Sequence, residues 1–596
     1  MSGKPTRPVL VFDGDCTFCR TWVGYWQALT GERVEYLPYQ SATKRFPQIP
    51  KADFQKAVHF ITTDKIYTGA EAVFQLNALL PARAWLLTLF YRIPFFAAAA
   101  EATYRQVATH RNAAYKITRA LWGTSVEPST YKSASALFMR ALALIYLIAF
   151  ASFGRQVRGL IGEQGIQPAA DFFSEVTRQY GAAGHWLVPT LFWWTHSDIA
   201  LVTIVWGGAL IAAVAAIARP FTSGQRAALV VLFVYYLSVV NGGQIFMGYQ
   251  WDFLLLEAGF LAIFLKPARI RVWLFQWLLF RLVFESGAVK LLSHDISWRN
   301  LTALAFHYQT QPLPTPLAWY MMQAPLWFQK TSTLVVLCGE LILPFLIFGP
   351  RRLKQIAGTG IIALQLLILL TGNYTFFNLL TIALCLFLFD DALIARKPRP
   401  QSKTQKVPLS PNRYVTAVLF TVILLASFTQ LAGMFGINAP APLTTAVSRI
   451  SGFGIVNPYG LFATMTTTRP ELSIEGSDDG VEWKPYVFKY KPGPLNRAPA
   501  WVAPNQPRLD WQLWFAALGN YRQNPWLLHF MAQLLHGSVP VLELVEQNPF
   551  PSKPPKLIRA ELYEYRFTTS DERRQTGNYW HRELRGEYFP PIGLRP

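Results

Sequence analysis

Charged residues are scarce in this chain of 596 residues. They make up 15% of it, against 52% hydrophobic residues, and the mean hydropathy is +0.22. Soluble proteins do not have this balance, which is typical of an integral membrane protein. Acidic residues are the rarer charge, with 34 Asp and Glu against 55 Lys and Arg. The basic residues gather beside apolar runs, where they set orientation, and no nucleic-acid motif accompanies them, so we expect no nucleic-acid partner.

Cysteine is also scarce, and its placement excludes a disulfide framework. Of the four cysteines, Cys16 and Cys19 form a C-x-x-C, whereas Cys338 and Cys385 lie in apolar runs. Because thiols in apolar helices are usually packing residues, we expect Cys338 and Cys385 to pack and not to relay electrons across the bilayer. Residues 1–30 lack the uninterrupted apolar stretch of a secretory signal, so we expect the N-terminus to begin in the cytoplasm.

Several catalytic motifs are missing as well. The chain contains no G-x-S-x-G, no phosphate-binding loop and no H-E-x-x-H, which gives a hydrolase little support. His307 has no second histidine at ligand spacing, and this favours a hydrogen-bonded structural role over metal ligation. We therefore predict neither a metal site nor a bound cofactor.

Long apolar runs, by contrast, are abundant, and hydropathy predicts nine membrane spans. They lie at about 135–153, 198–218, 225–241, 251–266, 271–292, 331–349, 354–371, 374–389 and 413–432. The fourth and the eighth are short for a membrane span.

The loops between these spans differ in charge, and this indicates an orientation. Basic residues concentrate at 219–226, 266–271, 351–354 and 396–413, whereas 241–250 carries no charge. The positive-inside rule then places residues 1–134 in the cytoplasm, and an odd number of spans places the C-terminus outside. We expect a multi-pass protein of the plasma or inner membrane, with the C-x-x-C and the C-terminal part on opposite sides.

Ionisable residues inside membrane spans cost roughly 2.5 to 3.5 kcal/mol each at a helix centre, so they are paired, turned inward or functional. The chain has six of them: Asp252, Glu257, Arg281, Glu285, Lys290 and Glu340. Arg281 and Glu285 are four residues apart and are predicted to pair on one helix face. Two interpretations stay open, a structural ion pair with a snorkelling lysine or a polar pocket that binds or transforms a ligand.

The segment 293–330 between two predicted spans is rich in aromatic residues and proline. Such a segment suits an interfacial cap on the helix bundle. We expect this cap to contain His307 and Tyr308 and to place four aromatic residues at headgroup level, Trp319, Tyr320, Trp327 and Phe328.

Residues 1–130 are predicted to form a soluble domain with strands at 9–12 and 34–37 around a helix at 21–29. Cys16 and Cys19 lie at the first strand-to-helix turn. A helix N-terminus favours the thiolate form, so Cys16 is the predicted attacking thiol and Cys19 the resolving one, although the nearby carboxylates of Asp13 and Asp15 oppose this. A redox site, a vestigial pair and half of a zinc site are the alternatives. The basic helices expected at 82–96 and 101–120 are predicted to rest on the membrane face.

The C-terminal residues, 433–596, are predicted to form a β-rich mixed domain. Strands are expected at 472–475, 482–483, 487–490 and 562–568, with a turn at Asp479-Gly480, and helices at 511–518 and 526–535. Arginine and aromatic side chains dominate protein interfaces, so four residues are candidates for gripping a partner protein: Arg508, Asp510, Trp511 and Trp514. The alternative is that they fill a small core.

Residues 8 to about 120 resemble the DCC thiol-disulfide oxidoreductase family, on the D-x-x-C-x-x-C of Asp13, Cys16 and Cys19, on Pro38 and on the stretch 69–72. This resemblance implies a thioredoxin-like fold and dithiol chemistry with Asp13, Cys16 and Cys19 in the site. It also allows a cytoplasmic redox partner.

Residues of about 135–592 resemble the lipase maturation factor family. The similar blocks are WDFLLLE at 251–257, SGAVKL at 286–291, HYQTQPLPTP at 307–316, TGNYTFFN at 371–378, NPYGLF at 457–462, IEGSDDG at 474–480, WVAP at 501–504 and PRLDWQ at 507–512. The resemblance implies a multispanning membrane protein that helps secreted lipases reach an active, assembled state. The family's membrane region is distantly similar to vitamin K-dependent carboxylases, which keeps an enzyme as an alternative.

The expected fold is therefore an α-helical multispanning membrane protein with three parts. These are a thioredoxin-like α/β domain at 1–130, about nine transmembrane helices at 131–432, and an extracytoplasmic β-rich α+β domain at 433–596. Three functions stay open: a maturation factor for a secreted lipase-like client, a membrane-embedded enzyme, and a membrane-anchored thiol-disulfide oxidoreductase.

Overall fold

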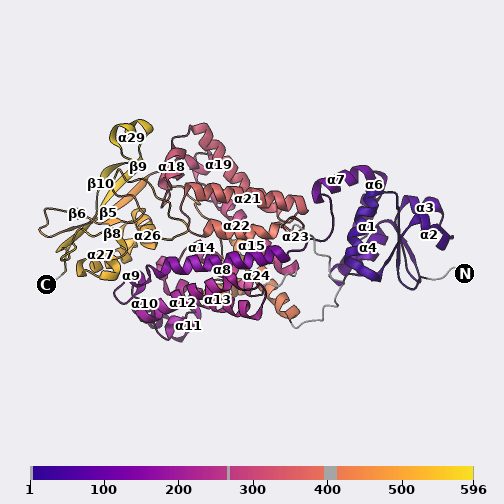
Figure 1. The fold of residues 1–596 in the computed structure, drawn as a ribbon, viewed down its shortest axis with the longest axis horizontal. Coiled ribbons are helices and arrows are strands. Elements are labelled where there is room, and N and C mark those ends of the chain that lie inside the picture. Colours follow the sequence, from indigo (N-terminus) through magenta and orange to yellow (C-terminus); the bar gives the residue numbers. More distant parts are fainter. Residues whose placement is uncertain (1–4, 265–268, 395–411, 595–596) are drawn as a thin grey trace. The chain divides into compact units, whose positions relative to one another are not determined.

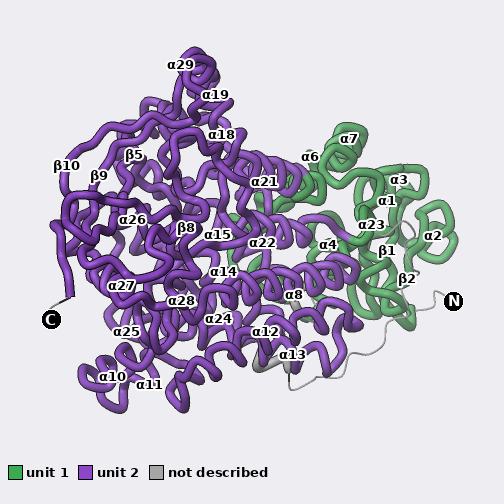
Figure 2. The backbone as a smooth tube through the Cα atoms, turned by 60° about the vertical axis from the view of Figure 1, so that its left-hand side comes forward, with its two compact units in different colours: residues 1–130, 348–355, 391–408 green, residues 131–347, 356–390, 409–596 purple. Residues whose placement is uncertain are grey.

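The computed structural model describes residues 5–264, 269–394 and 412–594. The chain divides into two compact units (Figure 2). Unit 1 contains residues 1–130, 348–355 and 391–408, and unit 2 contains residues 131–347, 356–390 and 409–596. The membrane helices and the C-terminal residues therefore belong to the same unit.

Unit 1 is built on a four-stranded sheet in the order β2-β1-β3-β4. Its strands are β1 (Val9–Phe12), β2 (Glu35–Pro38), β3 (His59–Ile61) and β4 (Ile66–Thr68). β1 is parallel to β2 and antiparallel to β3. The two strands predicted from sequence are β1 and β2, so the expected α/β domain is confirmed.

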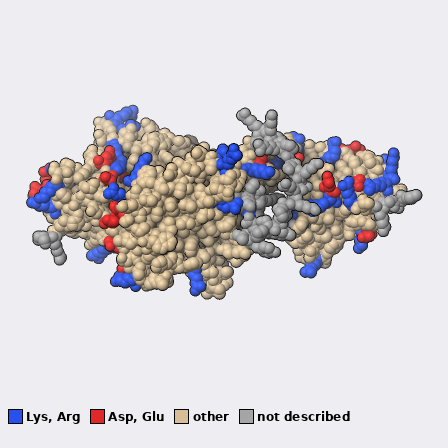
Figure 3. Space-filling model, turned by 60° about the horizontal axis from the view of Figure 1, so that its bottom comes forward, with Lys and Arg blue, Asp and Glu red and all other residues tan. Residues whose placement is uncertain are grey.

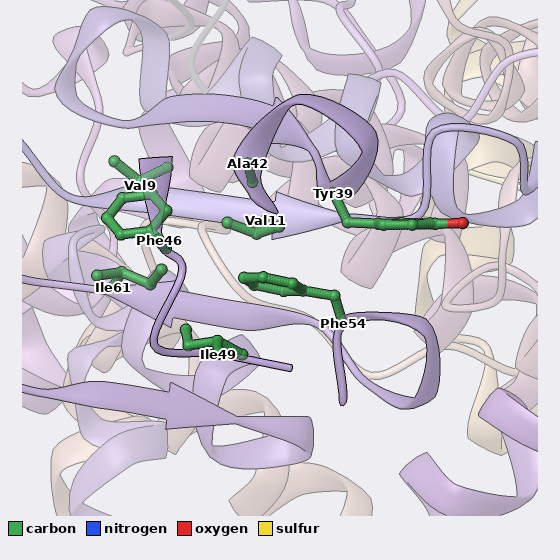
Figure 4. Close-up of a cluster of buried hydrophobic side chains, with 8 residues drawn as sticks. All are labelled: Val9, Val11, Tyr39, Ala42, Phe46, Ile49, Phe54 and Ile61. Carbon is green, nitrogen blue, oxygen red and sulfur yellow. The ribbon is translucent and has the colours of Figure 1, made fainter. Parts of the chain in front are cut away.

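Side chains alternate along β1 and supply one core on each face of the sheet. On one face, Val9 and Val11 pack against residues from α2 (Tyr39–Arg45) and α3 (Lys51–Lys56) (Figure 4). On the other, Leu10 and Phe60 pack against α1 (Thr17–Thr30) and α4 (Gly69–Ala78) through Val23, Ala72 and Leu76. The sheet is thus covered by helices on both faces.

Two helices were expected at 82–96 and 101–120. The structure has three in this stretch: α5 (Ala84–Arg92), α6 (Pro94–Thr109) and α7 (Arg111–Trp122). Pro94 explains the first break, because a residue before proline avoids helical angles, and Ile93 is extended at φ −117° and ψ 99°. Their predicted contact with the membrane face stays a prediction.

Seven helices in the described part of the chain are long and apolar enough to cross a membrane. They are α8 (Lys132–Gly154), α12 (Asp198–Ile217), α13 (Ser223–Gly242), α15 (Arg269–Leu292), α19 (Leu326–Leu341) with its continuation α20 (Leu343–Leu346), α21 (Arg351–Thr371) and α24 (Asn412–Met434) (Figure 1). The predicted count of nine is not confirmed.

The difference lies in the two short predicted spans. Residues 251–266 were expected to cross, but α14 (Gln250–Ile263) has 14 residues, about 21 Å at 1.5 Å per residue, and the hydrocarbon core is about 30 Å thick. Residues 374–389 contain only α22 (Phe377–Cys385) and the 3-10 turn Leu386–Leu388. Hydropathy counted both as spans because their side chains are apolar, although Leu254 and Leu384 are buried inside unit 2.

The outer surface of the helix bundle is apolar. On α12, Leu210, Val214 and Ile217 are exposed by 67%, 56% and 84%, and their spacing places them on one side of the helix. Figure 3 shows a broad uncharged surface of unit 2 with most Lys, Arg, Asp and Glu at its borders. In water such a surface would be unfavourable, so it belongs in a bilayer.

The C-terminal part of unit 2 contains an antiparallel sheet in the order β10-β9-β5-β6. Its strands are β5 (Arg469–Ser477), β6 (Lys484–Pro485), β9 (Leu557–Phe567) and β10 (Trp580–Ile592), and β7 (Val487–Phe488) pairs with β8 (Val545–Gln547). The predicted Asp479-Gly480 turn connects β5 and β6, with Gly480 at φ 76°. Residues 482–483 are not a strand, and sequence analysis missed β8 and β10.

The helices expected in this part are α26 (Arg508–Ala517) and α27 (Pro525–His536). Shorter helices complete unit 2: α9 (Val157–Ile161), α10 (Ala169–Tyr180), α11 (Gly184–Leu187), α16 (Ile296–Arg299), α17 (Ala303–Thr310), α18 (Pro316–Met322), α25 (Ala441–Ser451), α28 (Val539–Leu542) and α29 (Ser570–Thr576). One further short helix, α23, spans Asp391–Ile394.

Candidate functional site

The predicted site residues fall into two sets, the dithiol of unit 1 and the ionisable groups of unit 2. Cys16 is the N-cap of α1, and its sulfur accepts a hydrogen bond from the Cys19 backbone N–H at 3.3 Å. Both side chains are half-buried and free of disulfide. The geometry is that of a helix N-terminus directed at the first thiol, as the sequence predicts.

Cys19 differs from Cys16 in its surroundings. Burial, followed by the hydrogen bond and charge of Cys16, raises the pKa of the Cys19 thiol from 9.0 to about 12. Cys19 is thus protonated at neutral pH and is a poor attacking nucleophile. The division of labour in which Cys16 attacks and Cys19 resolves stays a prediction.

Asp13 is held by a residue that sequence analysis did not select. Arg111, at the start of α7, donates to Asp13 Oδ2 at 2.8 Å and to the Gln55 carbonyl at 2.7 Å. Asp15 accepts from Gln40 at 2.8 Å. The charge of Asp13, which was expected to oppose the thiolate, is therefore neutralised by Arg111. Arg111 lies 98 positions away, so the D-x-x-C-x-x-C motif carries no sign of this pair.

A cavity of about 1200 Å³ adjoins the dithiol. Cys16 and Asp13 line one part of it, and α6 and α7 supply Tyr104, Arg105 and Arg111 opposite. Cys16 is thus open to this cavity, whereas Cys19 does not line it.

In unit 2, Asp252 at the start of α14 binds Arg508 of α26. Both side chains are fully buried, and the two guanidinium nitrogens lie 2.8 and 2.9 Å from the carboxylate oxygens. Tyr236 also donates to Asp252, at 2.5 Å. A buried charge of this kind is stable only when paired and hydrogen-bonded, and here the partner comes from the C-terminal part.

Arg281 pairs with Glu257 rather than with Glu285, which corrects the predicted pair. Both groups are fully buried, and Glu257 also accepts from the Asn457 N–H at 3.0 Å and the Tyr459 hydroxyl at 2.8 Å. Glu285 instead accepts from the Tyr459 backbone N–H at 2.8 Å. The segment NPYG at 457–460 brings donors from outside α15, and helix spacing alone carries no information about them.

Lys290 does not snorkel to the surface but binds a second helix. Its ammonium lies 2.7 Å from Glu340 of α19, donates to the Ser286 carbonyl at 2.9 Å and lies over the Trp298 ring. Within the described residues, five of the six predicted intramembrane groups thus form three ion pairs, one of them with Arg508, and the sixth, Glu285, is bound by a backbone N–H. Asp252 and, through the segment 457–460, Glu257, Arg281 and Glu285 join the helix bundle to the C-terminal part, whereas Lys290 and Glu340 join two helices of the bundle. The structural interpretation predicted an ion pair but not these partners and not a joint with the C-terminal part.

His307 is hydrogen-bonded, with Nε2 3.1 Å from the Tyr374 hydroxyl. Tyr308 is buried in a cluster with Trp319 and with Tyr565, Phe567 and Trp580 of β9 and β10. Trp319 is therefore inside the protein and not at headgroup level, whereas Tyr320 and Trp327 are 56% and 68% exposed. Arg469 of β5 completes this joint by donating to three carbonyls of the segment 309–312.

The four candidate partner-gripping residues are all buried: Arg508, Asp510, Trp511 and Trp514. Asp510 accepts from the Tyr490 and Lys491 N–H groups at 2.8 Å, Trp511 packs edge-on against Trp251, and Trp514 donates to the Thr310 carbonyl at 2.9 Å. These side chains expose almost no surface to a partner, as side chains that fill a core would. The aromatic side chains of Trp511 and Trp514 were therefore as consistent with burial in a core as with binding of a partner.

Among the described residues, no group of three or more His, Cys, Asp or Glu side chains is placed to hold a metal ion. The residues that sequence analysis missed are Arg111, Tyr236, Asn457, Tyr459 and Arg469. Tyr236 acts on a residue 16 positions away, and the other four act on residues about 100 to 200 positions away.

Comparison with known proteins agrees with this architecture. Three family models match the chain: the DCC1-like thiol-disulfide oxidoreductase at residues 10–116, the lipase maturation factor transmembrane domain at 133–396 and the lipase maturation factor C-terminal domain at 455–590. No solved structure matches it.

Curated relatives cover most of the chain. Lipase maturation factor 2 of Gallus gallus is 35% identical over 77% of this chain and 81% of its own length, and the Homo sapiens protein is 33% identical over 77% and 82%. Lipase maturation factor 1 of Bos taurus is 32% identical over 76% and 88%. The chain is therefore a multi-pass membrane protein that belongs to the lipase maturation factor family and carries a DCC1-like thiol-disulfide oxidoreductase domain at its N-terminal end.

Proposed function

We propose that this protein is held in the plasma or inner membrane and assists the folding and assembly of secreted lipases or related clients. The observation that carries the proposal is the family match over both the helix bundle and the C-terminal part. The relatives are named for lipase maturation, and the residues matched here include Asp252 and Arg508, the ion pair that joins the two regions.

In this account the C-terminal part lies outside the cytoplasm, on the side where secreted proteins pass. Basic residues beside the spans support a cytoplasmic N-terminus. An odd number of crossings separates the two termini, and the number is odd whether α14 and α22 both cross or both do not.

The buried ion pairs give the C-terminal part a fixed position on the bundle. A client would meet its exposed apolar residues, among them Trp501, Phe515 and Leu518, which are 55%, 43% and 40% exposed. Exposed apolar surface of this kind suits a partly folded chain whose own apolar segments are not yet buried. The buried Arg508 and Trp511 act by holding α26 and not by touching the client.

The dithiol domain acts on a different, cytoplasmic partner, because the bilayer separates it from the secreted side. The Cys16 thiolate attacks a disulfide of that partner and forms a mixed disulfide, releasing one partner thiol. Cys19 then gives up its proton and attacks Cys16, which forms the Cys16–Cys19 disulfide and releases the second partner thiol. The partner is reduced and the domain oxidised by two electrons. The β2-β1-β3-β4 order supports a thioredoxin-like fold for this step.

Deletion of the gene tests the maturation proposal. The specific activity of a secreted lipase of the same cell should fall while its transcript level stays constant, and the intact gene should restore it. A Cys16→Ser gene should restore most of the activity, since the dithiol does not contact the client. Unchanged lipase activity in the deletion strain would refute the proposal.

A further inference from the structure

A second cavity, of about 520 Å³, lies inside unit 2 between α15, α17, α19 and α21. Its volume is within the roughly 300 to 1000 Å³ of small-molecule sites. Most of its wall is apolar, and four of its polar residues lie near one another at one end: Lys290 pairs with Glu340, His307 contacts Tyr374, and the Lys290 charge acts on His307. An apolar cavity with few polar groups fits an amphiphile.

The cavity exists because α19 and α21 diverge. They are close at Gly339, where an added Cβ would lie 3.2 Å from Leu364, and Gly360 is similarly close to Leu343. Toward Thr331 and Thr371 the helices separate and the cavity lies between them. Val335 and Leu367 line it and are 54% and 57% exposed, so it reaches the surface that meets the lipid chains.

Hydrogen bonds near the polar end define what a ligand must supply. Gln311 donates through Nε2 to the Tyr308 and Thr371 carbonyls at 3.2 and 2.8 Å, which fixes the orientation of its side-chain amide. The Tyr374 hydroxyl then donates its only proton to Gln311 Oε1 at 2.9 Å. His307 Nε2 is therefore the donor to the Tyr374 oxygen. The other ring nitrogen, Nδ1, then carries a lone pair, and it is buried without a hydrogen-bond partner among the described residues.

The charges at this end cancel. Lys290 is paired with Glu340 at 2.7 Å. Burial and the Lys290 charge lower the pKa of His307 to about 4, so its imidazole is neutral at pH 7. An anionic headgroup would find no unpaired cation among these groups, whereas an uncharged hydroxyl would satisfy the Nδ1 acceptor.

We propose that this cavity binds an uncharged lipid with an acyl chain and a free hydroxyl group, of the monoacylglycerol class. The acyl chain lies along the apolar wall between α19 and α21, and a hydroxyl donates to His307 Nδ1. The site is independent of the proposed maturation role, and its test does not use lipase activity.

The test uses the full chain in phosphatidylcholine vesicles with a monoacylglycerol that carries a photoreactive diazirine in its acyl chain. Mass spectrometry should place the crosslinks on the cavity-lining parts of α19 and α21. Ser332→Trp fills the cavity and should abolish these crosslinks. Leu334→Trp is the matched control, because Leu334 does not line the cavity and is 47% exposed, and it should retain them.

A methyl ester with the same photoreactive chain tests the hydroxyl. It should label the unaltered protein about fivefold less, because it cannot donate the hydrogen bond to Nδ1. His307→Phe should label equally with both probes. Equal labelling of the unaltered protein by both would overturn the assigned headgroup. Crosslinks spread evenly over outward residues such as Leu210 and Ile217 would overturn the site, since they indicate surrounding bilayer lipid only.

Discussion

Arg508 is the residue on which the joint between α14 and α26 depends most. Its guanidinium binds Asp252 with two hydrogen bonds and donates to the Phe246 carbonyl at 2.6 Å, all out of contact with solvent. Removal of one member of a buried pair leaves the other charge uncompensated. The size of that effect can be measured against an exposed pair of the same protein.

Arg508→Met should lower the free energy of unfolding by about 3 to 5 kcal/mol, because Asp252 stays buried without its cation. Arg178→Met is the control: its pair with Glu175 is 79% and 55% exposed, so little change is expected. Thermal unfolding in detergent, followed by tryptophan fluorescence, provides the measurement. The double variant Asp252→Leu with Arg508→Met should regain much of the loss, and equal midpoints for Arg508→Met and Arg178→Met would contradict the account.

Cys19 provides a test at the same scale in unit 1. The pKa of its thiol is raised to about 12, mainly by burial, and burial remains in a Cys16→Ser variant. The alkylation rate of Cys19 in that variant should therefore keep rising well above pH 9.0, the ordinary thiol value. The same raised pKa means that folding favours the protonated thiol, so its contribution to stability is present below pH 9.0 and is lost as the pH rises toward 12. A rate that levels off near pH 9 would show that Cys19 is not buried as described.

Local sequence predicted the dithiol, its position at a helix start and the presence of six charged groups in apolar helices. It did not predict their partners. Helix spacing suggested Arg281 with Glu285, but the shorter contact is to Glu257, 24 residues away, and Asn457 is 176 residues from Arg281. Contacts at such separation follow from the packing of whole elements and leave no local signal.

At the scale of elements, long apolar helices were predictable and short ones were not distinguished from spans. α14 is as apolar as a span, but its side chains face other protein elements, and hydropathy cannot tell a protein interior from a bilayer. β10 was missed for the opposite reason. Much of it is exposed and charged, as in the stretch 582–587, and its regularity comes from pairing with β9. Strands at an edge of this kind depend on tertiary context.

The contact between α15 and α19 gives a prediction at this scale. A Cβ added to Gly287 would lie 2.8 Å from Glu340 Cβ, beside the Lys290–Glu340 pair. Gly287→Ala should therefore push the helices apart and destabilise the protein by about 1 to 3 kcal/mol. The measurement is the same thermal unfolding experiment in detergent.

Gly433→Ala in α24 is the control for that substitution, because no atom lies within 4 Å of its added Cβ. It should be neutral or slightly stabilising, since alanine is favoured over glycine in a helix. Equal destabilisation by both substitutions would mean that helix packing at Gly287 is not tight.

At the scale of the whole molecule, each unit is compact, and unit 2 combines the bundle with the C-terminal part. Hydropathy and charge predicted the order of soluble, membrane and C-terminal regions along the chain. They did not predict that the joint between the last two is closed by the ion pair Asp252–Arg508 and by hydrogen bonds of residues 457–460 with Glu257, Arg281 and Glu285. This joint makes the side of the membrane on which the C-terminal part lies decisive for function.

The side of the membrane is therefore the most direct test of the account. A compartment-sensitive reporter is fused after Pro596, and a second fusion places the same reporter before residue 1. The account predicts that the C-terminal reporter signals only outside the cytoplasm and the N-terminal reporter only inside it. A cytoplasmic signal from the reporter after Pro596 would place the C-terminal part away from secreted lipases and contradict the proposed function.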